Sequence, residues 1–175
     1  MVARWEPKPI TEVNAPGERS PEALVQVLEA LGVETDPRYR AEGPRTWCNI
    51  ANWDATRALG CEVPHWIGLD GAPAKVGMGR ELNANGSILW LRAMGPRYGW
   101  RKAPEHLARV LAGEGKPVIV AWENKAGGSG HVAMLLPPAG PGAALEIWQA
   151  GKTNFRRAPL VRGFGPRPVE FFAHD

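Results

Sequence analysis

Two residues combine a reactive side chain with a position suited to catalysis. Cys48 lies in TWCNIANW, where we expect a helix to begin, and His131 lies in GGSGHVAML, where a glycine-rich loop leads into an expected strand. A thiol at a helix N-terminus beside a histidine has a lowered pKa and reacts as the thiolate. A histidine at a strand start is held rigidly where a helix N-terminus can meet it. The pair predicts a Cys48 nucleophile with His131 as its general base.

Each residue also has a simpler interpretation. A cysteine can be a small packed side chain, and a histidine at a strand end is often just exposed to water. A structural cysteine usually lies in the middle of a helix on its apolar face, whereas Cys48 lies in the first turn between Trp47 and Asn49. This position favours a site over the core, and we expect Trp47 and Asn49 to contact substrate.

A third polar residue would fix the tautomer of His131. Gln149 lies on the strand expected to follow that of His131, so its amide oxygen can accept from one imidazole nitrogen and leave the other for sulfur. Asn154 and Glu146 remain alternatives, because a turn or a one-residue register shift would place either of them there instead.

Acyl transfer also requires donors directed at the oxyanion. The backbone N–H of Cys48 is the expected first donor, and Tyr39, Asn83 and Asn85 are candidates for the second. Trp100 lies beside glycine and charged residues, where an aromatic ring could stack on a sugar or a peptide. We therefore count Asn83, Trp100 and Asn154 among the candidate substrate-binding residues.

The elements that position these residues follow from caps and apolar spacing. Ser20, Pro21 and Glu22 form a helix start, and Gly32 and Gly60 end the first two helices. We expect helices over 20–32, from the first turn at Cys48 to Gly60, over 81–94 and over 104–111, then strands at VIVAW, HVAMLL, ALEIWQA and PVEFFAH. Helices followed by sequential strands indicate an α+β fold, with N-terminal helices packed on a mostly antiparallel sheet.

Composition predicts one domain and excludes several functions. The chain has 175 residues, 44% hydrophobic and 22% charged, and its proline- and glycine-rich residues 1–19 read as an extended lead-in to a single domain over 20–175. The +3 charge is scattered, which argues against nucleic acid and suits approach to anionic polymers of other kinds. Cys61 and His65 are too few for a zinc site, and no glycine motif fits a phosphate loop, so we expect no metal or cofactor.

The chain carries no recognisable targeting segment. MVARWEPKPITEV lacks the apolar stretch of a secretory signal, and no run approaches the eighteen or so apolar residues needed to span a bilayer. We therefore expect a monomeric protein made in the cytoplasm without a signal peptide, with no disulfide and no membrane insertion. A target outside the cytoplasm would require release by a phage or a secretion system.

The segments TWCNIANWDATRALG, ELNANGSILWL, GKPVIVAW, GHVAML and IWQAGKTNF, from Thr46 onward, resemble the papain-like cysteine hydrolases of the NlpC and CHAP groups. These enzymes cut bacterial cell wall, and many are phage endolysins. The resemblance implies a papain-like fold, Cys48 as nucleophile, His131 as base and Gln149 as third residue, where CHAP members more often have Glu or Asn. NlpC enzymes usually have Asp before and Ser-Gly after the cysteine, whereas this chain has Trp47 before it and Asn49-Ile50 after it, so the bond that is cut stays open.

Two functional classes follow from this pattern. The first is a peptidoglycan endopeptidase or amidase that works through a thioester on Cys48. The second is a non-catalytic wall-binding or virion structural module of the same fold. An interbacterial amidase toxin would share the chemistry of the first. The segment 61–103 is longer than usual in such enzymes, and we expect it to add a wall to the substrate cleft.

Overall fold

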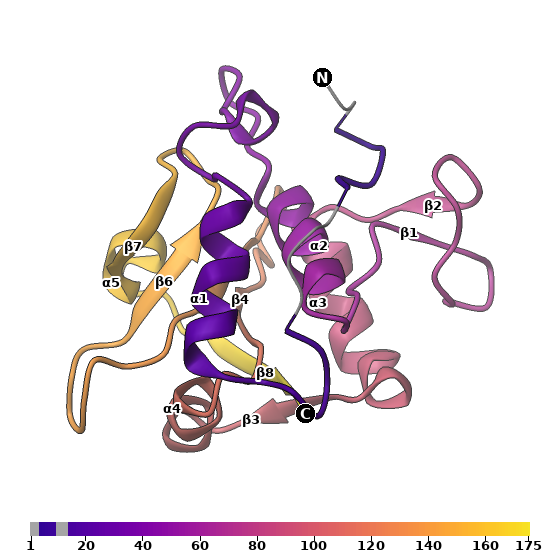
Figure 1. Ribbon diagram of the computed structural model, residues 1–175. Helices are drawn as coiled ribbons and strands as arrows, with labels where there is room; N and C mark the ends of the chain where they lie inside the picture. Colours follow the sequence, from indigo (N-terminus) through magenta and orange to yellow (C-terminus); the bar gives the residue numbers. More distant parts are fainter. Residues whose placement is uncertain (1–3, 10–13) are drawn as a thin grey trace.

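A six-stranded antiparallel sheet lies at the centre of the computed structural model, which describes residues 4–9 and 14–175 (Figure 1). Its strand order is β3-β8-β4-β5-β6-β7. The strands are β3 (Trp100–Ala103), β4 (Val118–Trp122), β5 (His131–Leu135), β6 (Glu146–Gln149), β7 (Phe155–Pro159) and β8 (Glu170–His174). A separate two-stranded ribbon joins β1 (Trp66–Ile67) to β2 (Arg80–Glu81).

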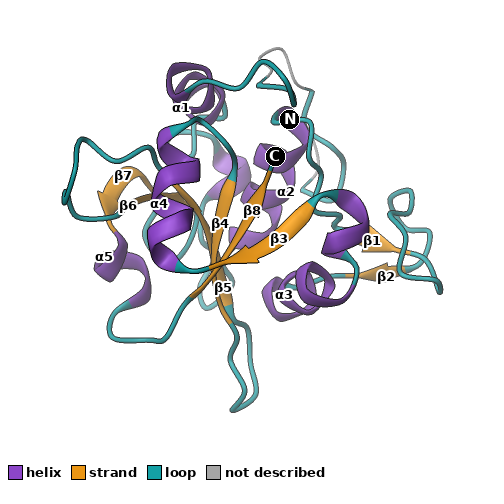
Figure 2. Cartoon of the chain, turned by 90° about the horizontal axis from the view of Figure 1, so that it is seen from below, coloured by secondary structure: helices purple, strands orange, loops and turns teal. Residues whose placement is uncertain are grey.

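Helices cover both faces of the sheet (Figure 2). On one face lie α1 (Pro21–Ala30), α2 (Cys48–Ala58) and α3 (Ala84–Ala93). On the other lie α4 (Glu105–Gly113) and α5 (Leu160–Phe164). Two short 3₁₀ helices, η1 (Pro37–Tyr39) and η2 (Gly95–Tyr98), precede α2 and follow α3. The arrangement confirms the α+β prediction.

The two covered faces explain why the central strands read as apolar runs. On β4, Ile119 and Ala121 join the core beneath α1, α2 and α3, whereas Val118 and Val120 join the core beneath α4 and α5. Alternate side chains of a strand point to opposite faces, so a strand buried on both sides is apolar throughout. The same alternation runs along β5, which carries His131 at its first position.

The predicted elements are present with shifted ends, and the structure adds the strands β1, β2, β3 and β7 and the helix α5. Oγ of Ser20 accepts a hydrogen bond from the N–H of Ala23, as the capping pattern predicts. The third helix begins at Ala84 and not at Glu81, because Asn83 caps it and Glu81 belongs to β2. The strands β3 and β7 were not predicted. Both lie at sheet edges and carry exposed charged residues in their centres, so neither shows a strand-like apolar pattern.

Two features of the predicted arrangement are wrong. The strands are not sequential in space, because the C-terminal strand β8 lies between β3 and β4. The helices do not all precede the strands in the chain, because α4 follows β3 and α5 lies between β7 and β8; these two helices cover the face opposite α1, α2 and α3. The order of elements along the chain does not reveal these placements, since they arise from long-range pairing. No helix in the described part of the chain is long and apolar enough to cross a membrane.

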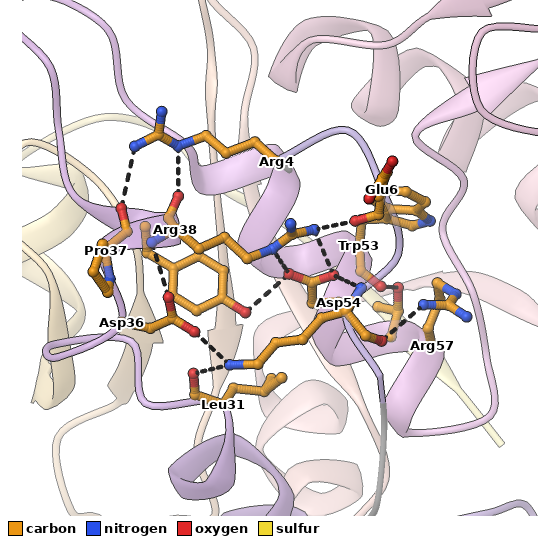
Figure 3. A network of polar contacts seen from close by, with 12 residues as sticks. Arg4, Glu6, Leu31, Asp36, Pro37, Arg38, Trp53, Asp54 and Arg57 are labelled. Carbon is orange, nitrogen blue, oxygen red and sulfur yellow. Dashed lines mark hydrogen bonds and ion pairs between the residues drawn. The ribbon is translucent and has the colours of Figure 1, made fainter. Parts of the chain in front are cut away.

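A buried polar network fixes the chain just before α2 (Figure 3). The carboxylate of Asp54, on α2, is fully buried and accepts from Nε of Arg38 at 2.7 Å and from the hydroxyl of Tyr39 at 2.9 Å. Nζ of Lys8 donates to Asp36 at 2.7 Å, which ties part of the predicted lead-in to η1. Residues 4–9 and 14–19 of that lead-in are described as turns and coil; its residues 1–3 and 10–13 lie outside the described residues.

Replacing Asp54 by alanine should destabilise the fold strongly. The change leaves the buried guanidinium of Arg38 without its carboxylate, and breaking a buried ion pair in this way costs about 3–5 kcal/mol. Urea unfolding should show this loss in Asp54→Ala. The control Glu42→Ala removes the exposed partner of Arg4 and should cost at most about 1 kcal/mol. Equal losses in the two variants would contradict the role given to the network.

Candidate active site

Cys48 is the first residue of α2, where the helix meets the start of β5. Cys48 is buried, with an exposed fraction of 3%. Its sulfur accepts hydrogen bonds from the backbone N–H groups of Asn49 and Val132. The N-cap residue Trp47 makes no capping hydrogen bond with its side chain. Because the first N–H groups of a helix lack intrahelical partners, this end of α2 presents donors and positive potential to the sulfur.

His131 connects the thiol to Gln149. Its imidazole hydrogen-bonds with Cys48, and its Nε2 lies 2.7 Å from Oε1 of Gln149. The amide of Gln149 is itself oriented, because its Nε2 donates to the carbonyl of Thr153 at 2.9 Å. Since Oε1 can only accept, Nε2 of His131 carries a proton and Nδ1 faces the sulfur. This arrangement brings together the three residues predicted to be catalytic.

Charge stabilisation within the pair outweighs its burial. Burial opposes ionisation of Cys48, but the hydrogen bond and positive charge of His131, with the two backbone donors, lower the pKa of the thiol. Burial likewise opposes protonation of His131, but its contacts with the Cys48 thiolate and with Gln149 raise the pKa of the imidazole. The opposite shifts bring the pKa values of the two groups toward each other, which favours the thiolate form of Cys48 and the imidazolium form of His131.

The backbone around Gln149 is shaped to admit this contact. The pairing of Met134 with Trp148 and of Leu135 with Ile147, continued along the strands, places position 151 opposite His131 and Gln149 diagonally across from it. A register shift between Ile147 and Gln149 separates the end of β6 from regular pairing with β7. A Cβ atom at Gly163 would overlap Oε1 of Gln149 and Cδ1 of Ile147, so a larger residue there would displace these side chains.

The paired residues lie between two adjoining cavities. One, of about 410 Å³, is lined by Cys48 and reaches β2 and the start of α3; the other, of about 670 Å³, is lined by His131 and Gln149. Both include Pro44, Thr46 and Ser129 in their walls, so they form two halves of one cleft. We call them the cysteine half and the histidine half.

Three of the predicted substrate-binding residues line the cysteine half: Trp47, Asn49 and Asn83. Nδ2 of Asn49 is committed to the carbonyl of Leu82 at 2.9 Å. Oδ1 of Asn83 caps α3, and its Nδ2 has no hydrogen-bond partner among the described residues. Residues Glu81 to Ala84, which are part of the segment 61–103, thus form one wall of the cleft. The sequence predicts that this segment adds such a wall.

The predictions for Trp100 and Asn154 as substrate-binding residues are wrong. Trp100 is fully buried, and its indole N–H donates to the carbonyl of Cys61. Nδ2 of Asn154 donates to the carbonyls of Val33 and Tyr39, so this side chain ties the loop after β6 to the segment before α2. In both positions the polar atoms are used to hold the fold together.

The structure also distinguishes among the alternatives for the third catalytic residue and for the second oxyanion donor. Glu146 lies at the other end of β6, paired with Arg157, and does not reach His131. As oxyanion donors, Tyr39 is excluded because its hydroxyl is buried against Asp54, and Asn85 because its amide binds the 124–128 loop. Of the three candidates for the second oxyanion donor, Asn83 therefore remains, because it lines the cleft and its Nδ2 is free to donate.

Sequence reasoning missed two groups that support the histidine, one side chain and one backbone carbonyl. The ring of Phe164 on α5 lies 4.9 Å from that of His131, and the carbonyl of Thr153 orients Gln149. No motif marks either group, because Phe164 is far from His131 in the sequence and a backbone carbonyl leaves no trace in residue type. Among the described residues no three His, Cys, Asp or Glu side chains gather to hold a metal, and both cysteines are free thiols.

The sequence matches no protein-family model and no curated protein.

The two thiols should differ sharply in reactivity. Burial raises the pKa of Cys61 to about 12, whereas that of Cys48 is lowered, so iodoacetamide at pH 7 should label Cys48 about 100-fold faster or more. The Cys48 rate should fall as the pH drops through its lowered pKa, because the thiolate is then protonated. Peptide mass spectrometry of samples quenched over time measures both rates.

His131→Ala supplies the control for this experiment. Without the imidazolium the pKa of Cys48 should rise, and each unit of that rise lowers its labelling rate at pH 6 about tenfold. Similar pH profiles for Cys48 in the variant and the native protein would show that His131 does not stabilise the thiolate.

Proposed function

We propose that this protein is a papain-like cysteine hydrolase that cleaves an amide bond in bacterial peptidoglycan. The observation that carries the proposal is the hydrogen-bonded row of Cys48, His131 and Gln149 between two halves of an open cleft. A nucleophile, a base and a group that orients the base are the parts that acyl transfer by a thiol requires.

Each residue has a definite task in the proposed reaction. The Cys48 thiolate attacks the carbonyl carbon, and the oxyanion accepts from the N–H of Cys48, with Nδ2 of Asn83 as the candidate second donor. His131 gives its proton to the leaving nitrogen, the C–N bond breaks and a thioester remains. Water then attacks the thioester while His131 takes the water's proton, and the C–S bond breaks to restore the thiolate.

The wall substrate rests on the resemblance of the chain from Thr46 onward to the NlpC and CHAP enzymes, together with a mild net charge of +3. A positive surface speeds encounter with anionic wall polymers. Under this proposal the protein acts as a monomer on the wall after a phage or a secretion system has released it, and an interbacterial toxin would use the same chemistry. Whether it acts as an endopeptidase or an amidase depends on the bond that enters the cleft.

A non-catalytic wall-binding or virion module is the competing proposal. Such a module would gain nothing from a buried thiol and imidazole with opposite pKa shifts, because burying charge costs free energy unless it serves a purpose. The perturbed pair therefore favours catalysis.

Cys48→Ala should abolish the clearing of purified sacculi, because the thioester cannot form without the sulfur. Turbidity measured over time tests this, and mass spectrometry of the released fragments identifies the bond. Cys61→Ser is the matched control, since that thiol lies outside the cleft and should affect lysis little. Undiminished clearing by Cys48→Ala would rule out Cys48 as the nucleophile.

Gln149→Ala should lower turnover by roughly 10- to 1000-fold, less than loss of Cys48, because the nucleophile and base remain and only the orientation of His131 weakens. Since Gln149 helps to raise the pKa of His131, its removal should lower that pKa and move the alkaline limb of the pH–rate profile to lower pH. Glu146→Ala, on the same strand, should leave the profile unchanged. An unmoved limb in Gln149→Ala would contradict the contact.

A further inference from the structure

The two halves of the cleft differ in charge. The histidine half is lined by three cationic side chains, Lys152, Arg162 and Arg167, and by no acidic residue among those described. The cysteine half is lined by one charge of each sign, Arg45 and Glu81. Positive charge is therefore concentrated on the side of His131 and Gln149.

The three cations have no acidic partner in the described chain. None of them forms an ion pair there, although the neighbouring Arg156 and Arg157 on β7 pair with Glu34 and Glu146. A cation that lines a cavity without a carboxylate partner is free to bind an anion from outside. The contrast shows that the neighbouring arginines of β7 are neutralised by carboxylates, whereas the cations of the histidine half are not.

Aromatic rings hold the two guanidinium groups in place without neutralising them. The guanidinium of Arg167 lies 4.6 Å from the ring centroid of Trp122, and its Nη1 donates to the carbonyl of Phe164 at 2.9 Å. That of Arg162 lies 5.7 Å from the ring centroid of Phe155. Stacking on a ring face restricts a guanidinium while its remaining N–H groups stay available for a planar anion.

The proposed reaction decides which half of the substrate occupies this cavity. His131 must protonate the leaving nitrogen, so the amine half of the amide lies on the side of the imidazole. The acyl half then lies on the other side of Cys48, where the start of α2 receives the oxyanion. The histidine half is thus the binding site for the leaving group.

We propose that the enzyme selects amides whose amine half carries a carboxylate, which Lys152, Arg162 and Arg167 bind as the C–N bond is positioned over Cys48. The inference rests on the proposed function and adds the chemical class of the leaving group to it. Guanidinium groups bind carboxylate and phosphate alike, but the leaving half of a wall peptide offers carboxylates. The interaction acts before the C–N bond breaks, so it affects formation of the thioester and not its hydrolysis.

Matched wall peptides test the inference directly. Two synthetic peptides share one acyl half and differ only in whether the carboxylate on the amine half is free or amidated; neither contains phosphate. The native enzyme should cleave the free acid with a kcat/KM about 10- to 100-fold higher, and added salt should reduce this ratio. The triple variant Lys152→Gln, Arg162→Gln, Arg167→Gln should bring the ratio near one.

A second triple variant controls for net charge. Lys75→Gln, Arg97→Gln, Arg101→Gln removes the same charge from exposed positions outside both cavities and should keep the native preference. If the native enzyme cleaves both peptides equally well, the inference is overturned while the proposed function stands. A preference lost equally in both triple variants would also overturn it.

A reaction of Cys48 that needs no amide cleavage distinguishes failure of the anion-site inference from failure of the proposed hydrolase function. In a Cys61→Ser background, Cys48 attacks the dianionic disulfide 5,5′-dithiobis(2-nitrobenzoate); the reagent S–S bond breaks, a new one forms to Cys48, and thionitrobenzoate leaves as a coloured thiolate. The rate with this dianion, divided by the rate with the uncharged 4,4′-dithiodipyridine, should fall about 10-fold or more in the cleft variant, Lys152→Gln, Arg162→Gln, Arg167→Gln. It should not fall in the charge control, Lys75→Gln, Arg97→Gln, Arg101→Gln. If the dianionic disulfide reacts more slowly in the cleft variant but the native protein cleaves neither peptide, the proposed hydrolase activity is rejected and the anion site stands. If the ratio of the two disulfide rates is the same in the cleft variant and the native protein, the anion site is rejected.

Discussion

The site depends on the contact between the first turn of α2 and the first residue of β5. Each partner alone would be destabilised by burial in its charged form, and only their mutual charge and hydrogen bonding shift the two pKa values in opposite directions. The packing of α2 on the sheet must therefore hold Cys48 and His131 together, because separating them would remove the interactions that lower the pKa of Cys48 and raise that of His131.

Two sets of contacts maintain that geometry from outside. On one side, the buried carboxylate of Asp54 joins α2 to Arg38 and Tyr39, which lie just before the helix in the chain. On the other, the carbonyl of Thr153 and the small size of Gly163 leave Gln149 one orientation, with its amide oxygen toward His131. Hydrogen-bond satisfaction and steric fit thus determine which imidazole nitrogen faces the sulfur.

The sequence predicted the parts of the site that depend on local signals. Apolar runs and glycine stops placed α2 and β5, and hence Cys48 and His131, while antiparallel pairing made Gln149 the leading choice for the third residue. Trp100 and Asn154 were misassigned because a residue type does not show whether a side chain is committed to the core or to backbone carbonyls. The cationic half of the cleft could not be foreseen, since its residues follow β6 and lie in or after α5, and the sheet topology alone brings them beside β5.

The central claim is that Cys48 becomes acylated in the course of amide cleavage. Wall peptide mixed with the protein and quenched in acid within the first turnovers should give an intact mass increased by the acyl half of the substrate. Fragmentation should locate that mass on the peptide containing Cys48, and hydroxylamine should remove it, as expected of a thioester. Substrate cleavage with no adduct on Cys48, or with the adduct on another residue, would contradict the account.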